Sequence, residues 1–398
     1  MNDARLDFLL SPRGQVLLKK FADTPITPEL TLKLSRQFPR SEITPVTEIL
    51  GLRQRALKKF RCADKMYFDR VGMEQASSDL TAEYHAARFA DYFGKSSEKR
   101  MSFMIADICC GIGSDSIALA KKGFRLISID NDPLRLRLFK QNVAAYGLER
   151  QIDTICADVR NQVPKADGIF IDPDRRPGGS RTISLHEMTP SIDILPKLRE
   201  ATPHIGMKLT PMVSLRKVPS DCEIEFVSVN RECREALFWF GGLKSAVRRA
   251  TILSEGGCET FCRIDGEDEP YCETGEPGQF LYEPNGAIIR AQLTDKLGCM
   301  LNARRIDPDL SLLTSNQHIP TRFAVCFKIE KSFPFQLKRL KRWLKQQDAG
   351  QVTIHRRGFP MTLDQIKKQL STKGTQSLSL FLTTVSGDHW VFQVRKLP

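Results

Sequence analysis

The stretch Ala106–Asp115, which reads ADICCGIGSD, decides the fold of this chain. It closes a short apolar segment and contains Gly111 and Gly113, two positions at which the backbone can approach a ligand closely. Ser114 or Asp115 can cap a helix that begins after the loop. We therefore expect a strand, a glycine-rich loop and a helix. The loop alone is weak evidence for a particular ligand, because proteins that bind dinucleotides also place one here.

Four successive predicted strands, beginning with the strand before this loop, end in an aspartate. The strands alternate with helical segments, and this alternation predicts a parallel sheet covered by helices. Ligands of such sheets bind outside the carboxyl ends of the strands, so we expect the carboxylates to meet at one crevice. Each aspartate alone is also explained as a strand-end turn or a helix cap, whereas the set favours a shared ligand. The four are Asp107, Asp130, Asp158 and Asp172.

The positions of three of these aspartates favour S-adenosylmethionine over NAD. Asp130 lies 19 residues after Gly111, where a carboxylate can accept both hydroxyl hydrogens of a ribose. Asp158 is placed to accept a hydrogen bond from an adenine amino group. The loop lacks the third glycine of the dinucleotide fingerprint, and Asp107 precedes it. A carboxylate at that position would repel a pyrophosphate but can attract the ammonium of a methionine moiety.

This set of motifs resembles the class I S-adenosylmethionine-dependent methyltransferases over about residues 80–262, because their glycine loop, ribose acid, adenine acid and post-fourth-strand motif are matched in order. The resemblance implies an α/β fold with a Rossmann-like seven-stranded sheet, and S-adenosylmethionine as the cofactor. The expected cofactor-binding residues are Asp107, Cys109, Gly111, Gly113, Asp115, Asp130, Asn131, Asp158, Val159 and Asp172.

The run DPDRR, Asp172–Arg176, is the predicted acceptor segment. Amino-methylating relatives have an Asp or Asn here, followed by Pro-Pro and an aromatic that stacks on the base. Asp172 matches the first position and can accept a hydrogen bond from an exocyclic amine. Asp174 replaces the second proline and Arg175 the aromatic; an arginine can stack on a base, pair with a phosphate, or bridge to a carboxylate such as Asp174. The candidate catalytic residues are Asp172, Pro173, Asp174 and Arg175.

Three other interpretations of single residues are weighed against simpler ones. RNA 5-methyluridine enzymes have a similar DPPR-like run but add a cysteine nucleophile in a later segment, and residues 208–219 (KLTPMVSLRKVP) contain no cysteine. Tyr84 and His85 can cover the cofactor, although packing is the favoured role. Cys258, Cys262 and Cys272 are irregularly spaced without an evident fourth ligand, so no metal is expected.

The C-terminal region carries most of the net charge of +13. Residues 322–398 contain 15 Lys and Arg against four Asp and Glu, and such a concentration favours a polyanionic partner over an ordinary solvated surface. Its strand-helix-strand-helix-strand-strand pattern predicts a small α/β domain. With RRGFP and LFLTT it resembles the THUMP-like domain of bacterial class I methyltransferases, and true THUMP domains bind RNA. The segment FQLKRLKRWLKQ predicts a helix with a basic outer face.

We expect four parts: a helical N-terminal module (1–79), the class I methyltransferase domain (80–262), a connecting region (263–320) and the THUMP-like basic domain (321–398). Helix starts are predicted at Thr27-Pro28 and at Thr44-Pro45. The sequence shows neither a signal peptide nor an apolar run of the roughly 18 residues that a membrane span requires. Cysteine usage is typical of reduced thiols, and a cytoplasmic protein is expected.

The sequence therefore predicts an S-adenosylmethionine-dependent methyltransferase that modifies a base amino nitrogen of structured RNA, delivered by residues 321–398. One alternative is a methyltransferase that acts on a protein or a small molecule. Another is an RNA-binding protein with a degenerate transferase fold.

Overall fold

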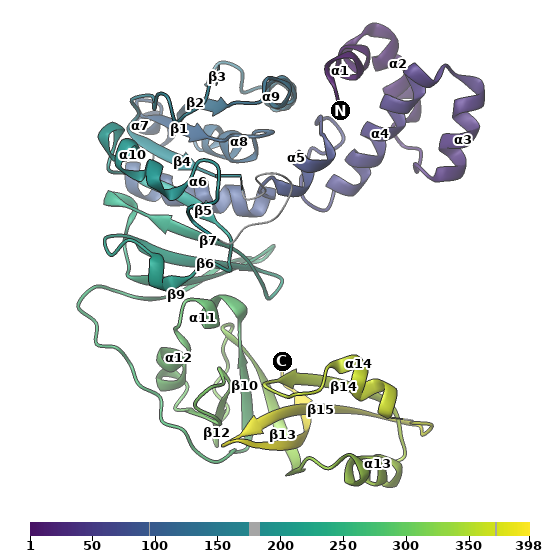
Figure 1. Cartoon of the computed structure of the whole chain (residues 1–398), viewed down its shortest axis with the longest axis vertical. Coiled ribbons are helices and arrows are strands. Elements are labelled where there is room, and N and C mark those ends of the chain that lie inside the picture. The colour runs from purple at the N-terminus through teal and green to yellow at the C-terminus, as the bar shows by residue number, and fades with distance from the viewer. Residues whose placement is uncertain (95, 175–183, 371) are drawn as a thin grey trace. The chain divides into compact units, whose positions relative to one another are not determined.

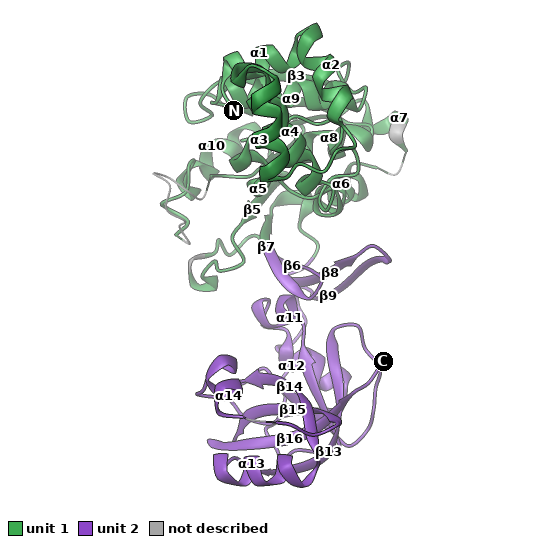
Figure 2. Ribbon diagram, turned by 90° about the vertical axis from the view of Figure 1, so that its right-hand side faces the viewer, with its two compact units in different colours: residues 1–223, 236–245 green, residues 224–235, 246–398 purple. Residues whose placement is uncertain are grey.

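The computed structural model describes residues 1–94, 96–174, 184–370 and 372–398 (Figure 1). Internal contacts divide the chain into two compact units (Figure 2). Unit 1 contains residues 1–223 and 236–245, and unit 2 contains residues 224–235 and 246–398. In the described residues, no helix is long and apolar enough to cross a membrane.

The chain begins with helices that share one apolar core. The predicted start at Thr27-Pro28 is confirmed, because the Thr27 hydroxyl accepts a hydrogen bond from the Leu30 amide at 3.2 Å. The predicted start at Thr44-Pro45 is wrong: α4 begins at Arg40, and Pro45 is buried inside it. Burial of this helix outweighs the single backbone hydrogen bond that a proline forfeits. The helices are α1 (Asp3–Leu10), α2 (Pro12–Phe21), α3 (Pro28–Gln37), α4 (Arg40–Ala56) and α5 (Arg70–Gln75).

The larger sheet has the strand order β3-β2-β1-β4-β5-β7-β6-β8-β9. Strands β1 to β5 are mutually parallel, and β7 is antiparallel to β5. The strands are β1 (Met104–Ile108), β2 (Arg125–Asp130), β3 (Ile152–Cys156), β4 (Gly168–Ile171), β5 (Ile205–Leu209), β6 (Glu223–Val229), β7 (Glu232–Trp239), β8 (Arg248–Ser254) and β9 (Gly257–Arg263).

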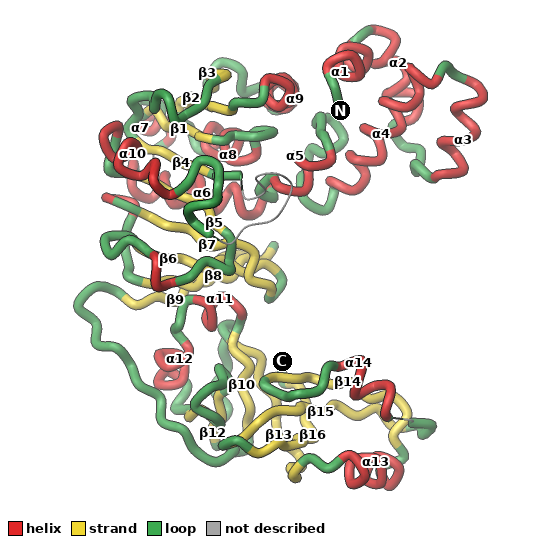
Figure 3. The backbone as a smooth tube through the Cα atoms, viewed as in Figure 1, coloured by secondary structure: helices red, strands yellow, loops and turns green. Residues whose placement is uncertain are grey.

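Helices connect and cover the parallel strands (Figure 3). Strands β1, β4 and β5 are almost fully buried apolar runs, as expected for parallel strands with both faces covered. The chain runs outward from β1 to β3 and then returns to place β4 on the other side of β1, so the strand order reverses at this point. Such a reversal opens a crevice at the carboxyl ends of β1 and β4. The helices are α6 (Asp79–Phe93), α7 (Ser97–Arg100), α8 (Ser114–Lys121), α9 (Pro133–Ala145) and α10 (Leu195–Ala201), with short 3-10 turns η2 (Ile192–Ile194), η3 (Leu215–Lys217) and η4 (Gly241–Leu243).

Unit 2 contains a second, mostly antiparallel sheet in the order β11-β12-β10-β13-β16-β15-β14. Alternate residues of β15 and β16 enter two different cores, because successive side chains of a strand point to opposite faces. Helices α13 and α14 pack on one of these cores. The elements are β10 (Phe280–Pro284), α11 (Gly286–Arg290), α12 (Thr294–Met300), β11 (Arg304–Arg305), β12 (Leu313–Ser315), β13 (Ala324–Pro334), α13 (Leu337–Gln346), β14 (Ala349–Arg357), α14 (Leu363–Gln369), β15 (Gln376–Val385) and β16 (Asp388–Lys396).

The predicted α/β architecture is confirmed: helices come first, a mostly parallel sheet follows, and the chain ends with the predicted strand-helix-strand-helix-strand-strand order. Strands β8 and β9 extend the larger sheet beyond the seven strands expected. Strands β10 to β12, from the expected connecting region, pair in the same sheet as the C-terminal strands. The four domain boundaries remain predictions.

Candidate active site

The glycine-rich loop between β1 and α8 turns through three residues with positive φ: Cys109 (60°), Gly111 (56°) and Gly113 (95°). A Cβ atom on Gly113 would lie 2.5 Å from the Phe139 ring, so this position requires glycine for space as well as for conformation. A Cβ atom on Gly111 would meet no heavy atom within 4 Å. The backbone at Gly111 therefore borders open space, whereas Gly113 is packed against the protein.

Two cavities lie at the carboxyl ends of the parallel strands in unit 1. Cys109, Asp130, Arg135 and Asp174 line both cavities, which therefore adjoin. Of the predicted site residues, the first cavity is also lined by Asp107, Gly111, Asp115, Asp172 and Pro173. The second is also lined by Asn131, Asp158 and Val159. Gly113 does not line either cavity, and Arg175 lies outside the described residues.

Asp107 and Asp130 are buried carboxylates on neighbouring strands. Asp107 is 1% exposed and accepts a short hydrogen bond from the Ser116 hydroxyl. Burial, and then the charge of Asp115, raises the pKa of Asp107 well above its usual value. Asp130 accepts hydrogen bonds from the amides of Gly111 (2.9 Å) and Asp132 (3.0 Å), yet burial raises its pKa. The Asp130 carboxylate thus holds the glycine loop against the end of β2.

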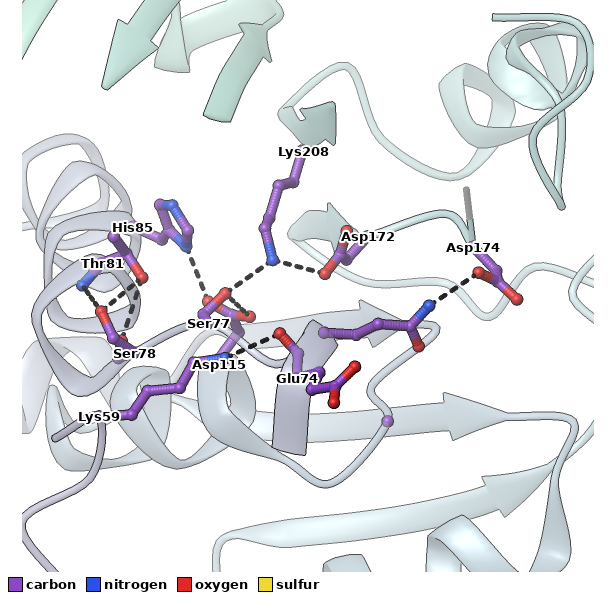
Figure 4. Close-up of polar contacts among 12 residues, drawn as sticks. Lys59, Glu74, Ser77, Ser78, Thr81, His85, Asp115, Asp172, Asp174 and Lys208 are labelled. Carbon is purple, nitrogen blue, oxygen red and sulfur yellow. Dashed lines mark hydrogen bonds and ion pairs between the residues drawn. The ribbon is translucent and has the colours of Figure 1, made fainter. Parts of the chain in front are cut away.

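Asp115, at the start of α8, has its carboxylate committed to protein partners (Figure 4). Its Oδ1 lies 2.7 Å from His85 Nδ1, and its Oδ2 accepts from the Ser77 hydroxyl at 2.8 Å. Burial raises the pKa of Asp115, but His85, the Lys208 ammonium and Ser77 outweigh it and the net shift is downward. His85 is 1% exposed, packs on Phe170 at a ring distance of 5.0 Å and does not line either cavity. His85 therefore packs inside the protein, as favoured from the sequence, and also forms a hydrogen bond with Asp115.

Asp158, the expected adenine acceptor, is held by its own neighbour. Arg160 donates to Asp158 through its backbone amide (2.9 Å) and its guanidinium (2.6 Å at the shortest). These hydrogen bonds lower the pKa of Asp158. An adenine amino group that donates to Asp158 would share the carboxylate with Arg160.

The segment predicted to bind the acceptor follows β4, and its two aspartates are held by hydrogen bonds. Lys208 Nζ on β5 donates to Asp172 Oδ2 at 2.6 Å. Gln75 Nε2 donates to Asp174 Oδ1 at 3.2 Å, and the backbone of Asp174 forms a two-way bridge with Thr189 (2.8 and 2.9 Å). The sequence did not identify Gln75 or Lys208. The signal available for Lys208 was a lone lysine within the apolar strand IGMKL.

The N-terminal helices form part of the wall of the first cavity, which the sequence did not predict. Gly72 and Gln75 of α5, and Ser77 from the loop after it, line this cavity together with the glycine loop. Ile112 of that loop belongs to the apolar core of the N-terminal helices. Asn142 on α9 is fully buried and donates to the Ile112 carbonyl (2.9 Å) while accepting from the Tyr67 amide (2.7 Å). The helices and the loop are thus one packed structure.

The residues around the first cavity fit S-adenosylmethionine. The Ser114 hydroxyl oxygen is buried at this cavity and has no hydrogen-bond partner in the described part of the chain, as expected where a ligand supplies one. Gly111 leaves room for close approach. The carboxylates supply acceptors for an ammonium and for ribose hydroxyls, whereas a pyrophosphate would meet like charge. No group of three or more His, Cys, Asp or Glu side chains in the described ranges is arranged to hold a metal ion.

Comparison with known proteins finds two matching family models. A family model described as RNA cap guanine-N2 methyltransferase matches residues 102–189, and one described as THUMP domain-like matches residues 324–396. Two uncharacterized S-adenosylmethionine-dependent methyltransferases, from two Mycobacterium tuberculosis strains, are each 28% identical over 325 residues, which cover 80% of this chain and 84% of theirs. The chain is an S-adenosylmethionine-dependent methyltransferase with a C-terminal THUMP-like domain. The predicted cofactor is thereby confirmed.

Two further similarities concern the fold and one short segment of this methyltransferase. A crystal structure of a methyltransferase candidate from Porphyromonas gingivalis W83 matches 100% of both chains at 21% identity with a TM-score of 0.78, and so it shares the fold. A 23S rRNA (uracil(1939)-C(5))-methyltransferase of Neisseria lactamica is 33% identical over 89 residues, which cover 21% of this chain and 20% of that protein.

Proposed function

We propose that this methyltransferase modifies an amino nitrogen of a base in structured RNA, with the exocyclic amine of guanine as the preferred acceptor. The observation that carries the proposal is the Asp172 carboxylate at the first cavity. Its Oδ2 accepts from Lys208, whereas its Oδ1 has no hydrogen-bond partner among the described residues. An ionised carboxylate oxygen only accepts hydrogen bonds. Asp172 therefore suits an acceptor that donates an N–H.

The chemistry requires positioning more than acid-base catalysis. When bound, S-adenosylmethionine supplies a methyl carbon that is activated by the adjoining sulfonium. Asp172 Oδ1 accepts an N–H from the acceptor amine and so orients the nitrogen for in-line attack. Asp172 or water would take the proton that the amine releases when it receives the methyl group from the cofactor sulfonium.

We assign the cofactor to residues of the two adjoining cavities. Asp130 would accept the ribose hydroxyls, with Asn131 beside it, and Asp107 would face the methionine ammonium. Asp158 and Val159 would bound the adenine in the second cavity. The open space beside Gly111 leaves room for the cofactor to approach the loop backbone.

The RNA substrate is supported by unit 2 and by the family descriptions. Helix α13 has an exposed basic face above the buried side chains of Leu340, Trp343 and Leu344. Exposed cations of this density neutralise phosphates and release counterions. The model that matches residues 102–189 is described by guanine N2 of an RNA cap, and the model that matches residues 324–396 is described as THUMP domain-like. The basic residues of α13 are Lys338, Arg339, Lys341, Arg342 and Lys345.

Two alternatives are less well supported. Uracil C5 methylation, the activity named for the Neisseria protein, is disfavoured here because residues 208–219 offer no cysteine nucleophile. A protein or small-molecule acceptor would leave the basic face of α13 without a role.

The test is methyl transfer from labelled S-adenosylmethionine to total cellular RNA by the purified full chain. We expect label that disappears after nuclease treatment, and a methylated guanine amine in the nucleosides analysed by mass spectrometry. Asp172→Asn should reduce transfer by about 10²–10⁴-fold. The control is Asp221→Asn, which removes a carboxylate that pairs with Arg199 and lines neither cavity, and it should leave transfer unchanged.

The outcomes separate the alternatives. Label that survives nuclease but not protease would overturn the RNA proposal in favour of a protein acceptor. Cofactor binding by calorimetry without transfer to RNA, protein or small molecules would favour an RNA-binding protein.

A further inference from the structure

Lys208 is a charged side chain inside an apolar, fully buried strand. All residues of β5, with the sequence IGMKL, are buried, and Lys208 is 3% exposed. A lysine is almost never buried to this extent unless its ammonium is paired, because removing the charge from water is unfavourable. An aliphatic residue would fill this place in a strand core without that cost. The ammonium therefore calls for an explanation other than packing.

The ammonium of Lys208 lies between the acceptor segment and the start of α6 (Figure 4). It donates to Asp172 Oδ2 at 2.6 Å and to the Ser77 hydroxyl at 2.9 Å. Ser77 in turn donates to Asp115 Oδ2, whose other oxygen lies 2.7 Å from His85 Nδ1. An ionised carboxylate only accepts hydrogen bonds. The hydrogen bonds of this series therefore run in one direction, with Lys208 donating to Ser77 and Ser77 donating to Asp115. The Ser77 hydroxyl that accepts from the ammonium is thus fixed in turn by its own hydrogen bond to Asp115.

We propose that Lys208 is the positioning residue of the acceptor side. By donating to Asp172 Oδ2, it fixes the rotation of the carboxylate and leaves Oδ1, which has no partner among the described residues, facing the acceptor amine. This inference rests on the proposed function of Asp172. It adds that the acceptor N–H is directed to Asp172 Oδ1, because the Lys208 ammonium already donates to Oδ2.

The same chain of hydrogen bonds links the acceptor side to the cofactor side. Asp115 belongs to the first turn of α8, directly after the glycine loop, and Asp172 follows β4. Lys208 and Ser77 span the distance between these two carboxylates. The relative placement of donor and acceptor therefore depends on residues that do not touch the reacting atoms.

The test is a double-mutant cycle of Lys208→Met and Asp172→Asn with steady-state kinetics on the RNA acceptor. We expect each single variant to lower kcat by about 10²-fold or more, with the KM for RNA and the calorimetric Kd for S-adenosylmethionine little changed. The double variant should lose little more than Asp172→Asn alone, since Lys208 acts through Asp172. The matched control is Lys296→Met. Lys296 also pairs with a carboxylate, that of Glu267, but neither residue lines either cavity, so the kcat of this variant should stay at the wild-type value.

A second variant guards against loss of folding. Lys208→Ala should regain part of its kcat when ethylammonium is added, whereas ethanol, of similar size but without charge, should not restore it. Wild-type kcat in Lys208→Met, or full multiplication of the two losses in the double variant, would overturn the proposal. So would equal rescue by the alcohol, which would indicate that Lys208 only fills space.

Failure of the proposed function is distinguishable from failure of this inference. If the wild type labels a protein or a small molecule instead of RNA, the RNA proposal fails, and the same cycle measured on that acceptor still tests Lys208.

Discussion

The cavities of unit 1 and helix α13 of unit 2 handle charge in opposite ways. Around the first cavity, Asp107, Asp115 and Lys208 are each less than 10% exposed and hydrogen-bonded within the protein. On α13 the five basic side chains are exposed, and none has a carboxylate partner in the described part of the chain. Buried, fixed charges suit one small ligand of defined geometry, whereas exposed cations suit a polyanion of variable shape. Protein stability and cofactor affinity should therefore depend on the residues around the first cavity. The salt-dependent affinity for the substrate should depend on the basic residues of α13.

The largest expected effect sharpens the rigid side of this comparison. Gly113→Ala forces an alanine to φ 95° and its Cβ to 2.5 Å from the Phe139 ring. The left-handed conformation and the overpacking together should lower the free energy of unfolding by roughly 2–5 kcal/mol, measured by urea denaturation.

Gly111→Ala is the matched partner of that variant. Its Cβ meets no heavy atom within 4 Å, so only the backbone cost of about 1–2 kcal/mol applies. The methyl group would instead enter the space proposed for the cofactor. We expect a Kd for S-adenosylmethionine weakened by about tenfold or more. Equal unfolding energies for the two variants would contradict the distinction between a packed and an open glycine.

The interaction between the glycine loop and the N-terminal helices should have the next largest effect. Asn142→Ala removes the partner of the buried Tyr67 amide and of the Ile112 carbonyl. Each buried group left unsatisfied costs about 1–3 kcal/mol. The free energy of unfolding measured with urea should therefore fall by at least this amount. A change within error would mean that the helices and the loop are not coupled through Asn142.

Neutralising α13 tests the exposed side of the comparison. The triple variant Lys338→Gln, Arg342→Gln and Lys345→Gln should weaken RNA binding and flatten the plot of log K against log salt by about 0.9 for each phosphate that is no longer neutralised. The Kd for S-adenosylmethionine and the unfolding energy should not change. The control triple Lys19→Gln, Lys33→Gln and Arg36→Gln removes the same number of exposed cations from α2 and α3. An equal weakening in that control would show that net charge, rather than α13, governs binding.

The sequence predicts local features of this molecule well and distant pairings poorly. The glycine loop and the four strand-end aspartates could be recognised because each depends on a few adjacent residues with a strand or turn signature. Lys208 and Ser77 are 131 residues apart and meet only through the packing of β5 beside the start of α6. No periodicity marks such a pair, and a lone lysine in an apolar strand was the one local sign.

The N-terminal helices also show that local structure could be predicted from the sequence and a distant contact could not. Their caps and apolar spacing predict a helical module, but not that Ile112 of the glycine loop completes its core. The predicted start of α4 at Thr44-Pro45 was wrong, because burial of the helix outweighed the local preference of proline for a helix start. The roles of all the site residues stay predictions. For Asp158, Arg160 already holds the carboxylate, and Arg175 lies outside the described residues.

The smallest expected effect concerns pH and separates stability from cofactor binding at Asp107. Burial raises the pKa of Asp107 well above its usual value, so the folded state favours the protonated form. The stability this contributes is fully present below the unfolded pKa of about 3.9 and is lost as pH rises through the folded pKa. Binding of an ammonium favours the ionised form, so cofactor affinity should rise over the same pH window. Calorimetry in buffers of different ionisation enthalpy should detect proton release on binding to the wild type and a smaller release in Asp107→Asn. Equal release in both would place the ammonium away from Asp107.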